Sequence, residues 1–227
     1  MALKFSTTDQ TGTNHGVKML VYGLSGSGKT VLCSTAPYPI ILSAEAGLLS
    51  LRRFRLPVIE IRSVEDLTEA HRWCLSSNEA KGFQTVCIDS ISEIGELVLA
   101  NAKRQVKDPR QAYGELIEKM LSTIKAYRDL PGKHVYMSAK MEPVKDELTG
   151  IVRYMASMPG SKLGPQLPYL YDEVFRLGIN KPPQGEAYRF LQTNSDLQYD
   201  AKDRSGTLDA AEPPDLNRVI NKILGVK

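Results

Sequence analysis

The feature that most constrains this chain is a glycine-rich octapeptide near its N-terminus. Residues 23–30 read Gly-Leu-Ser-Gly-Ser-Gly-Lys-Thr and fit the pattern G-x-x-x-x-G-K-[ST]. An apolar run at 18–22 precedes the octapeptide, and a helix-compatible stretch from Gly28 to about Thr35 follows it. This strand–loop–helix context is the one that the pattern requires. The sequence therefore predicts a phosphate-binding loop inside an α/β unit.

Each part of the octapeptide has its own role in holding a nucleotide. Glycines let the backbone wrap closely, so that amide groups point at phosphate oxygens, and the N-terminus of the following helix adds partial positive charge. The Lys29 ammonium is expected beside the β- and γ-phosphates, and the Thr30 hydroxyl on Mg²⁺. The predicted nucleotide-binding residues are Gly23, Ser25, Gly26, Ser27, Gly28, Lys29, Thr30 and Val31.

A magnesium ion at Thr30 needs a second anionic ligand, normally at the end of a neighbouring strand. Asp89 closes the β-rich run at 85–88 and lies far enough along the chain for strands and helices to intervene. We therefore predict Thr30 and Asp89 as the metal ligands. The alternative is that Asp89 is only a strand end or a helix cap.

Apolar runs alternate with helical periodicity over most of the chain, which predicts βαβ units and a mainly parallel sheet. After Pro168 the strand spacing is closer to that of a hairpin. We expect a single α/β core domain over residues 17–227, with a β-rich C-terminal edge, after a flexible N-terminal arm at 1–16. The expected strands are 18–22, 40–42, 58–61, 85–88, 134–137, 173–177 and 188–191, and the expected helices are 28–35, 63–74, 115–129 and 213–223.

Composition excludes several classes of protein. With 42% hydrophobic and 24% charged residues the chain is not disordered, and a net charge of +3 is no argument for nucleic acid by itself. No apolar run is long enough to cross a membrane, and the N-terminus lacks an apolar signal core, so we expect no membrane partner and a cytoplasmic location. Cys33, Cys74 and Cys87 are an odd number without metal-type spacing, and we expect buried thiols.

Two other classes of phosphate-loop protein lack their motifs here. The only candidate for the guanine reader Asn-Lys-x-Asp is 180–183, which reads Asn-Lys-Pro-Pro, and no LSGGQ-like signature is present. The chain instead resembles the RecA-like branch of P-loop ATPases. The segment 41–45 ends in Ala-Glu and resembles the strand end whose glutamate polarises the attacking water, which implies a catalytic role for Glu45. Residues 86–90 resemble the Asp-Ser of the same family.

The same resemblance implies further residues. The strand at 136–140 takes the place of the γ-phosphate sensor, implying Ser138 and Lys140, although RecA has Asn-Gln there. Residues 201–206 resemble the Lys-x-Arg-x-Gly of hexameric replicative helicases, which implies that Lys202 and Arg204 act on a neighbouring subunit's γ-phosphate. The alternative is a charged β-turn. We see no clear arginine finger for Lys29 within the chain, so a homo-oligomer, ring or filament, is expected.

Size and motif order resemble phage-encoded, core-only RecA-like proteins, which include single-strand annealing recombinases. This implies ATP and Mg²⁺ as cofactors, single-stranded DNA and a single-strand-binding protein as partners, and the host cytoplasm as location. Two RecA-like DNA loops are expected, one before the helix at 115–129 and one in a long loop at 142–168. The implied DNA-binding residues are Lys103, Arg104, Lys107, Arg110, Arg153, Tyr154 and Lys162.

Two other functions stay open at this point. One is an ATP-binding regulatory or assembly module without DNA contact. The other is a small-molecule phosphotransferase, although no arginine-rich lid is found. Charged runs such as 103–110 are often only solvated surface.

Overall fold

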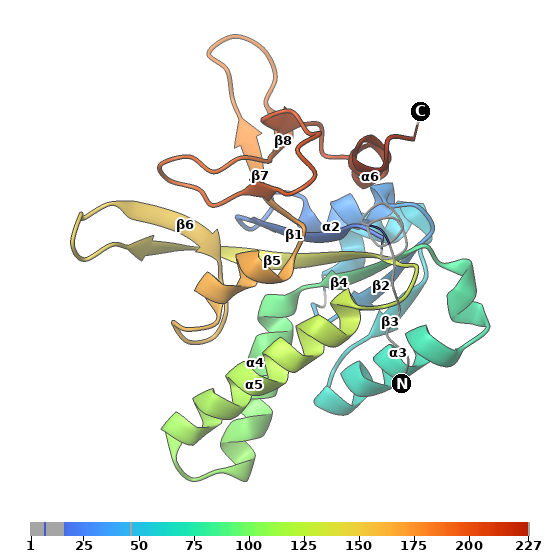
Figure 1. The fold of residues 1–227 in the computed structure, drawn as a ribbon, viewed down its shortest axis with the longest axis vertical. Helices are drawn as coiled ribbons and strands as arrows, with labels where there is room; N and C mark the ends of the chain where they lie inside the picture. The colour runs from blue at the N-terminus through green and yellow to red at the C-terminus, as the bar shows by residue number, and fades with distance from the viewer. Residues whose placement is uncertain (1–6, 8–15, 46, 227) are drawn as a thin grey trace.

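One β-sheet runs through the molecule, in the strand order β10-β8-β7-β1-β5-β4-β2-β3 (Figure 1). The structure is a computed structural model that describes residues 7, 16–45 and 47–226, so the predicted arm at 1–16 lies outside the described residues except for Thr7 and Gly16. The strands of this order are β1 Lys18–Gly23, β2 Pro39–Ser43, β3 Val58–Glu60, β4 Thr85–Asp89, β5 His134–Lys145, β7 Glu173–Asn180, β8 Tyr188–Gln192 and β10 Ala211–Glu212.

Six neighbouring strands of the sheet are parallel, from β7 through β1, β5, β4 and β2 to β3. The antiparallel pairs lie at the β-rich edge, where β8 follows β7, and in the extension of β5. The predicted class, α/β with a mainly parallel sheet flanked by helices and a β-rich C-terminal edge, is confirmed.

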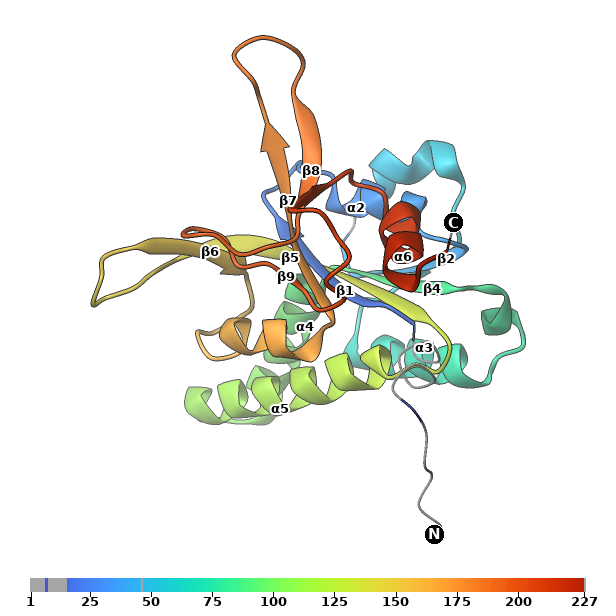
Figure 2. The ribbon, with the colours of Figure 1, turned by 45° about the horizontal axis from the view of Figure 1, so that its top comes forward.

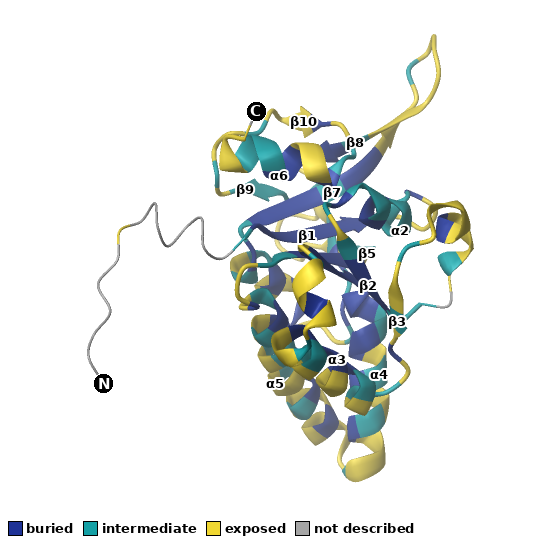
Figure 3. Cartoon of the chain, turned by 90° about the vertical axis from the view of Figure 1, so that its right-hand side faces the viewer, coloured by how far each residue is buried: buried dark blue, intermediate teal, exposed yellow. Residues whose placement is uncertain are grey.

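Helices cover both faces of the sheet, and the alternation of side chains along β1 shows why. Leu20 and Tyr22 point into a core with α3 Val64–Ser76, α4 Ile91–Gln105 and α5 Pro109–Arg128. Met19 and Val21 point into a second core with α2 Lys29–Leu32 and α6 Leu216–Leu224. Because a strand buried on both faces needs apolar residues at successive positions, residues 19–22 of β1 are a continuous apolar run. Figure 3 shows this strand as buried.

The helices between residues 91 and 128 differ from the expectation. The expected helix at 115–129 begins earlier, at Pro109, and α4 was not expected at all. Asp108 accepts a hydrogen bond from the Arg110 amide, and a proline follows it at the first helical position, which together form a helix start. The loop predicted before Glu115 is therefore a short corner between two helices.

The prediction of a long loop at 142–168 is also wrong. Strand β5 continues to Lys145, and β6 Val152–Ala156 returns antiparallel to it, so that a β-hairpin projects from the sheet (Figure 2). A 3₁₀ segment, η4 Gly164–Leu170, follows. The hairpin of β7 and β8, which the spacing predicted, is confirmed.

Two smaller expectations concern the cysteines and the membrane. Cys33, Cys74 and Cys87 are buried free thiols, as predicted. Burial raises the pKa of the Cys33 thiol well above its ordinary value. Within the described part of the chain, no helix combines the length and apolar character needed to span a membrane.

Candidate nucleotide-binding site

The glycine-rich loop joins β1 to α2 and lines a cavity of ≈ 470 Å³, a volume typical of small-molecule sites. Gly26 and Gly28 have φ values of 74° and 107°, in the left-handed region that favours glycine. A Cβ on Gly23 would lie 2.9 Å from the Leu177 carbonyl oxygen, so the backbone of β7 passes close to the loop. The sequence folds here into the phosphate-binding loop that its pattern predicted.

Lys29 lies at the mouth of this loop. Its Nζ donates to the carbonyl oxygens of Gly23, at 2.9 Å, and Leu24, at 3.0 Å. Burial lowers the pKa of the Lys29 ammonium, and the negative charges of Glu45 and Asp89 oppose this shift. A partly buried ammonium ion beside two carboxylates can exchange its carbonyl partners for phosphate oxygens.

The predicted metal ligands meet at the carboxyl edge of the parallel strands. Thr30 Oγ1 donates to Asp89 Oδ2 at 2.6 Å, and the Ser138 hydroxyl donates to Asp89 Oδ1. Asp89 is 1% exposed. A hydroxyl oxygen and a carboxylate oxygen in contact are the hard donors that Mg²⁺ prefers, so these residues fit the ion. Ser138, the first predicted sensor residue, thus contacts the metal ligand.

Glu45 and Lys140 reach the same edge through different partners. The Ser90 hydroxyl donates to Glu45 Oε1 at 2.6 Å, which orients the carboxylate from the residue after Asp89. Lys140, the second predicted sensor, forms an ion pair with Glu93 on α4. Lys140 still lowers the pKa of Lys29 through its charge, so the two ammonium groups are within electrostatic range.

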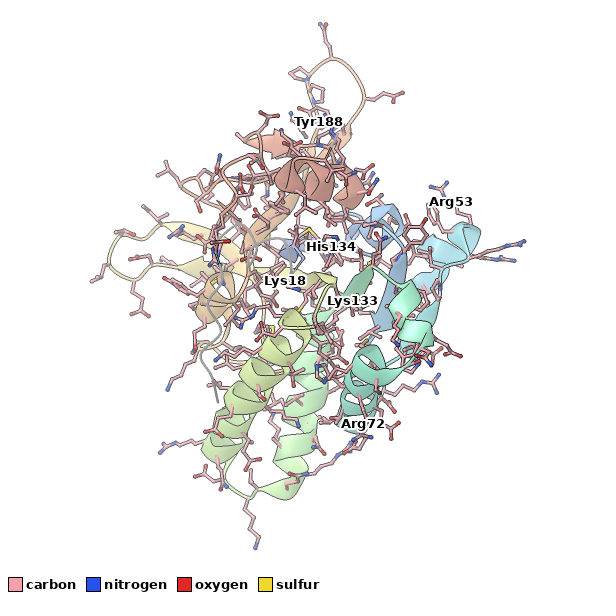
Figure 4. The ribbon with its side chains drawn as sticks, turned by 45° about the vertical axis from the view of Figure 1, so that its right-hand side comes forward. Lys18, Arg53, Arg72, Lys133, His134 and Tyr188 are labelled. Carbon is pink, nitrogen blue, oxygen red and sulfur yellow. The ribbon has the colours of Figure 1, made fainter. Side chains whose placement is uncertain are left out.

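Apart from Glu45, the sequence did not indicate the walls of the cavity. One wall holds Glu45 together with Ser50 and Arg53 of η2 Leu48–Phe54, and the other holds Arg189 and Pro214. Figure 4 labels Arg53, which lies on η2, and Tyr188, which precedes Arg189 on β8. The two labelled residues lie on separate projections of the ribbon. The sequence showed no clear arginine finger within the chain, and the structure places the side chains of Arg53 and Arg189 along this cavity.

Tyr136 is another residue at the site that the sequence did not indicate. The fully buried Tyr136 donates from its hydroxyl to the Lys29 carbonyl oxygen at 2.8 Å. The apolar run of β5 contained this tyrosine, but nothing in the run distinguished it from a core residue.

Lys202 and Arg204 lie at the other end of the sheet. Lys202 and Asp203 form β9, which pairs with Glu173 and Val174 at the start of β7. Lys202 Nζ donates to backbone carbonyls of 168 and 171, and Arg204 forms an ion pair with Asp172 at 2.8 Å. Both side chains therefore contact the same segment, and both are remote from their own phosphate loop.

The predicted DNA-binding residues divide into two groups. Arg110 and Lys162 line one groove of ≈ 490 Å³ together with Tyr113, and the Lys103 ammonium lies 5.7 Å from the centre of the Tyr113 ring. Arg104 and Lys107 are exposed nearby, at the α4–α5 corner.

The β5–β6 hairpin holds the second group. Arg153 forms an ion pair with Asp200, and the half-buried Tyr154 stacks on Tyr199 with 5.2 Å between ring centres. One face of the Tyr154 ring is thus covered. The DNA contacts of both groups stay predictions.

Comparisons with known proteins give a family for most of the chain. A family described as an AAA domain matches residues 15–205, which include the loop, Glu45, Asp89 and Arg204. No curated protein matches the chain. A KaiC-like protein of the hyperthermophilic archaeon Pyrococcus horikoshii is similar in structure, with 15% identity, a TM-score of 0.43 and 78% of each chain covered.

The flagellar accessory protein FlaH of Methanocaldococcus jannaschii is also similar in structure. Its identity is 12% and its TM-score 0.40, over 83% of this chain and 84% of FlaH. These two likenesses concern the fold alone.

Proposed function

This chain belongs to the AAA domain family, and we propose that it is a Mg²⁺-dependent ATPase that acts on single-stranded DNA. The proposed setting is phage recombination or replication, of the annealing or strand-exchange type, in the host cytoplasm. The observation that carries the ATPase proposal is one arrangement at the sheet edge. There Lys29, the contacting pair Thr30 and Asp89, and the oriented carboxylate of Glu45 share one site.

The loop and its partners would bind and orient the triphosphate. Amide groups of the loop and the Lys29 ammonium would hold the phosphate oxygens. Thr30 and Asp89 would hold Mg²⁺, which, when bound, neutralises charge on the β- and γ-phosphates. Ser138 would keep Asp89 in position through its hydroxyl.

Glu45 would act as the general base. Its Oε1 already accepts a hydrogen bond from Ser90, which leaves Oε2 to accept one from a water molecule. As that water attacks the γ-phosphorus, Glu45 takes its proton, and the bond from phosphorus to the bridging oxygen of ADP breaks.

The groove beside Tyr113 supports the DNA part of the proposal. Two segments far apart in the sequence supply its cations, Arg110 and Lys162. The exposed Tyr113 ring extends from α5 to the loop at 159–162, where it lies next to Gly160. Cations that follow a phosphate backbone next to an aromatic ring suit single-stranded nucleic acid of any sequence.

Arg204 supports the proposal of a homo-oligomer. Its side chain is 59% exposed and lies at the far end of the sheet from its own loop. An arginine in that place would serve the loop of another subunit and not its own.

ATP turnover with and without single-stranded DNA tests the proposal. We expect turnover that DNA stimulates, and a loss of at least about tenfold in ATP binding or turnover for Lys29→Ala. Unchanged nucleotide affinity and turnover in a folded Lys29→Ala protein would contradict the ATPase assignment. Phosphate transfer to a metabolite would instead favour a kinase.

A pair of double variants tests the DNA groove. Arg110→Ala with Lys162→Ala should weaken oligonucleotide binding and flatten its salt dependence, by a slope of roughly 0.7 for each lost phosphate contact. The matched control is Arg72→Ala with Lys81→Ala, which removes two exposed cations near α3. Equal binding by both double variants at every salt concentration would exclude the groove, and ATP turnover without any DNA binding would favour a regulatory module.

A further inference from the structure

Arg189 connects the β7–β8 hairpin to the phosphate loop. Its Nε donates to the Ser27 carbonyl oxygen at 2.7 Å, across 162 residues of sequence. A Cβ built on Gly28 would lie 3.4 Å from Nε and 3.5 Å from Cδ, so the side chain lies directly over the loop residue before Lys29. The guanidinium group is therefore part of the wall of the nucleotide cavity.

Within the part of the chain that the structure describes, the remaining hydrogen-bond donors of this guanidinium have no partner. An arginine has five N–H donors, and the contact with Ser27 uses the one on Nε. Among the described residues, no carboxylate pairs with Arg189 and no acceptor takes a hydrogen bond from its Nη atoms. Three other arginines of the C-terminal half have partners. Arg153 and Arg204 pair with aspartates, and Arg176 lies 3.6 Å from the centre of the Tyr199 ring.

We propose that Arg189 is a nucleotide-binding residue supplied by the same chain as the loop. Its Nε holds the Ser27 carbonyl, and its two Nη atoms donate to phosphate oxygens of the nucleotide seated on the loop. A guanidinium held at one edge presents its other edge as a rigid fork, which matches two phosphate oxygens. This inference rests on the proposed ATP binding.

Arg189 lies beside the phosphate loop of its own chain, whereas Arg204 lies far from that loop. Strand β9, next to Arg204, pairs with the start of β7, which aligns with Met19 and Leu20 at the start of β1. The phosphate loop follows the other end of β1. Arg189 would thus contact the nucleotide of its own chain, whereas Arg204 lies at the opposite end of β1 from that nucleotide.

The decisive variant is Arg189→Gln. The Nε2 atom of glutamine is as many bonds from the backbone as the arginine Nε, so this variant keeps a donor for the Ser27 carbonyl and removes only the Nη fork. We expect ATP and ADP, each with Mg²⁺, to bind roughly tenfold to a hundredfold more weakly by calorimetry, the scale of hydrogen bonds to a charged group. Thermal unfolding without nucleotide should match that of the parent.

Two further variants complete the experiment. Arg189→Ala should bind as weakly as Arg189→Gln, and Lys181→Ala, which removes an exposed cation from the same hairpin, should bind as the parent does. Parent-like affinity in Arg189→Gln would overturn the proposal, because the arginine would then only brace the loop. A parent protein that binds no nucleotide would instead refute the proposed function.

Discussion

Glu173 provides a test of how the β9 segment is held. This glutamate opens β7, is 1% exposed, and its Oε2 has no hydrogen-bond partner among the described residues. It neighbours Asp203, which lies between Lys202 and Arg204. Burial, and then the charge of Asp203, raise the pKa of Glu173 from 4.5 to about 8. The folded protein therefore keeps this carboxyl protonated at neutral pH.

The consequence is a loss of stability as pH rises. The unfolded chain releases the proton near pH 4.5, whereas the folded chain holds it until about pH 8, so the free energy of unfolding falls between these values. Each pH unit in this window lowers the free energy of unfolding by about 1.4 kcal/mol. By pH 7 the total loss reaches at most roughly 3 kcal/mol. Glu173→Gln keeps the shape of the side chain and has no proton to lose. We expect it to be about as stable as the parent near pH 5 and more stable by ~3 kcal/mol at pH 7.

Urea unfolding of parent and variant at several pH values from 5 to 8 measures this difference. The control is Glu147→Gln, at the exposed turn of the β5–β6 hairpin, which should change stability little at any pH. A difference between Glu173→Gln and the parent that stays constant within about 0.5 kcal/mol across this range would refute the reasoning. Glu173 would then be ionised in the folded protein.

The other predictions concern turnover. Glu45→Gln should bind ATP normally and hydrolyse it roughly a hundredfold more slowly in a phosphate-release assay, the scale of a positioned general base, and unaffected turnover would leave Glu45 as only a strand-end residue. Asp89→Asn, which keeps the size of the side chain and removes its charge, should raise the Mg²⁺ concentration needed for half-maximal turnover by about tenfold or more, and an unchanged Mg²⁺ titration would exclude Asp89 as a ligand. Arg204→Ala should bind ATP nearly normally and lose turnover by roughly 10³-fold. Mixing Arg204→Ala with Lys29→Ala should restore partial activity, and no recovery despite demonstrated subunit exchange would mean that Arg204 does not act across an interface.

Much of the nucleotide site was predictable because its chemistry is local. The loop from Gly23 to Thr30 carries its own backbone requirements, and the apolar run before it buries both faces of a central strand. Asp89 was predictable because a carboxylate that ends a parallel strand must lie at the same edge as the loop. These features depend on neighbours in sequence and on the direction of strands.

The basic segments show where local patterns were insufficient. Arg110 was expected in a loop, although Asp108 and Pro109 begin a helix there. Tyr154 was expected to contact DNA, and its ring stacks on Tyr199. In each case the signal was a charge or an aromatic ring, and neither residue type specifies a backbone conformation or a partner.

The sequence by itself determined the phosphate loop, the parallel sheet and the meeting of Thr30 with Asp89, because these follow from short-range geometry and the burial of apolar runs. Only the tertiary structure decided that Arg189 reaches the loop, that Arg204 does not, and that Arg110 and Lys162 share a groove. Each of these depends on how hairpins and helices pack after the chain has turned back on itself. A contact across 162 residues leaves no pattern in the sequence on either side of it.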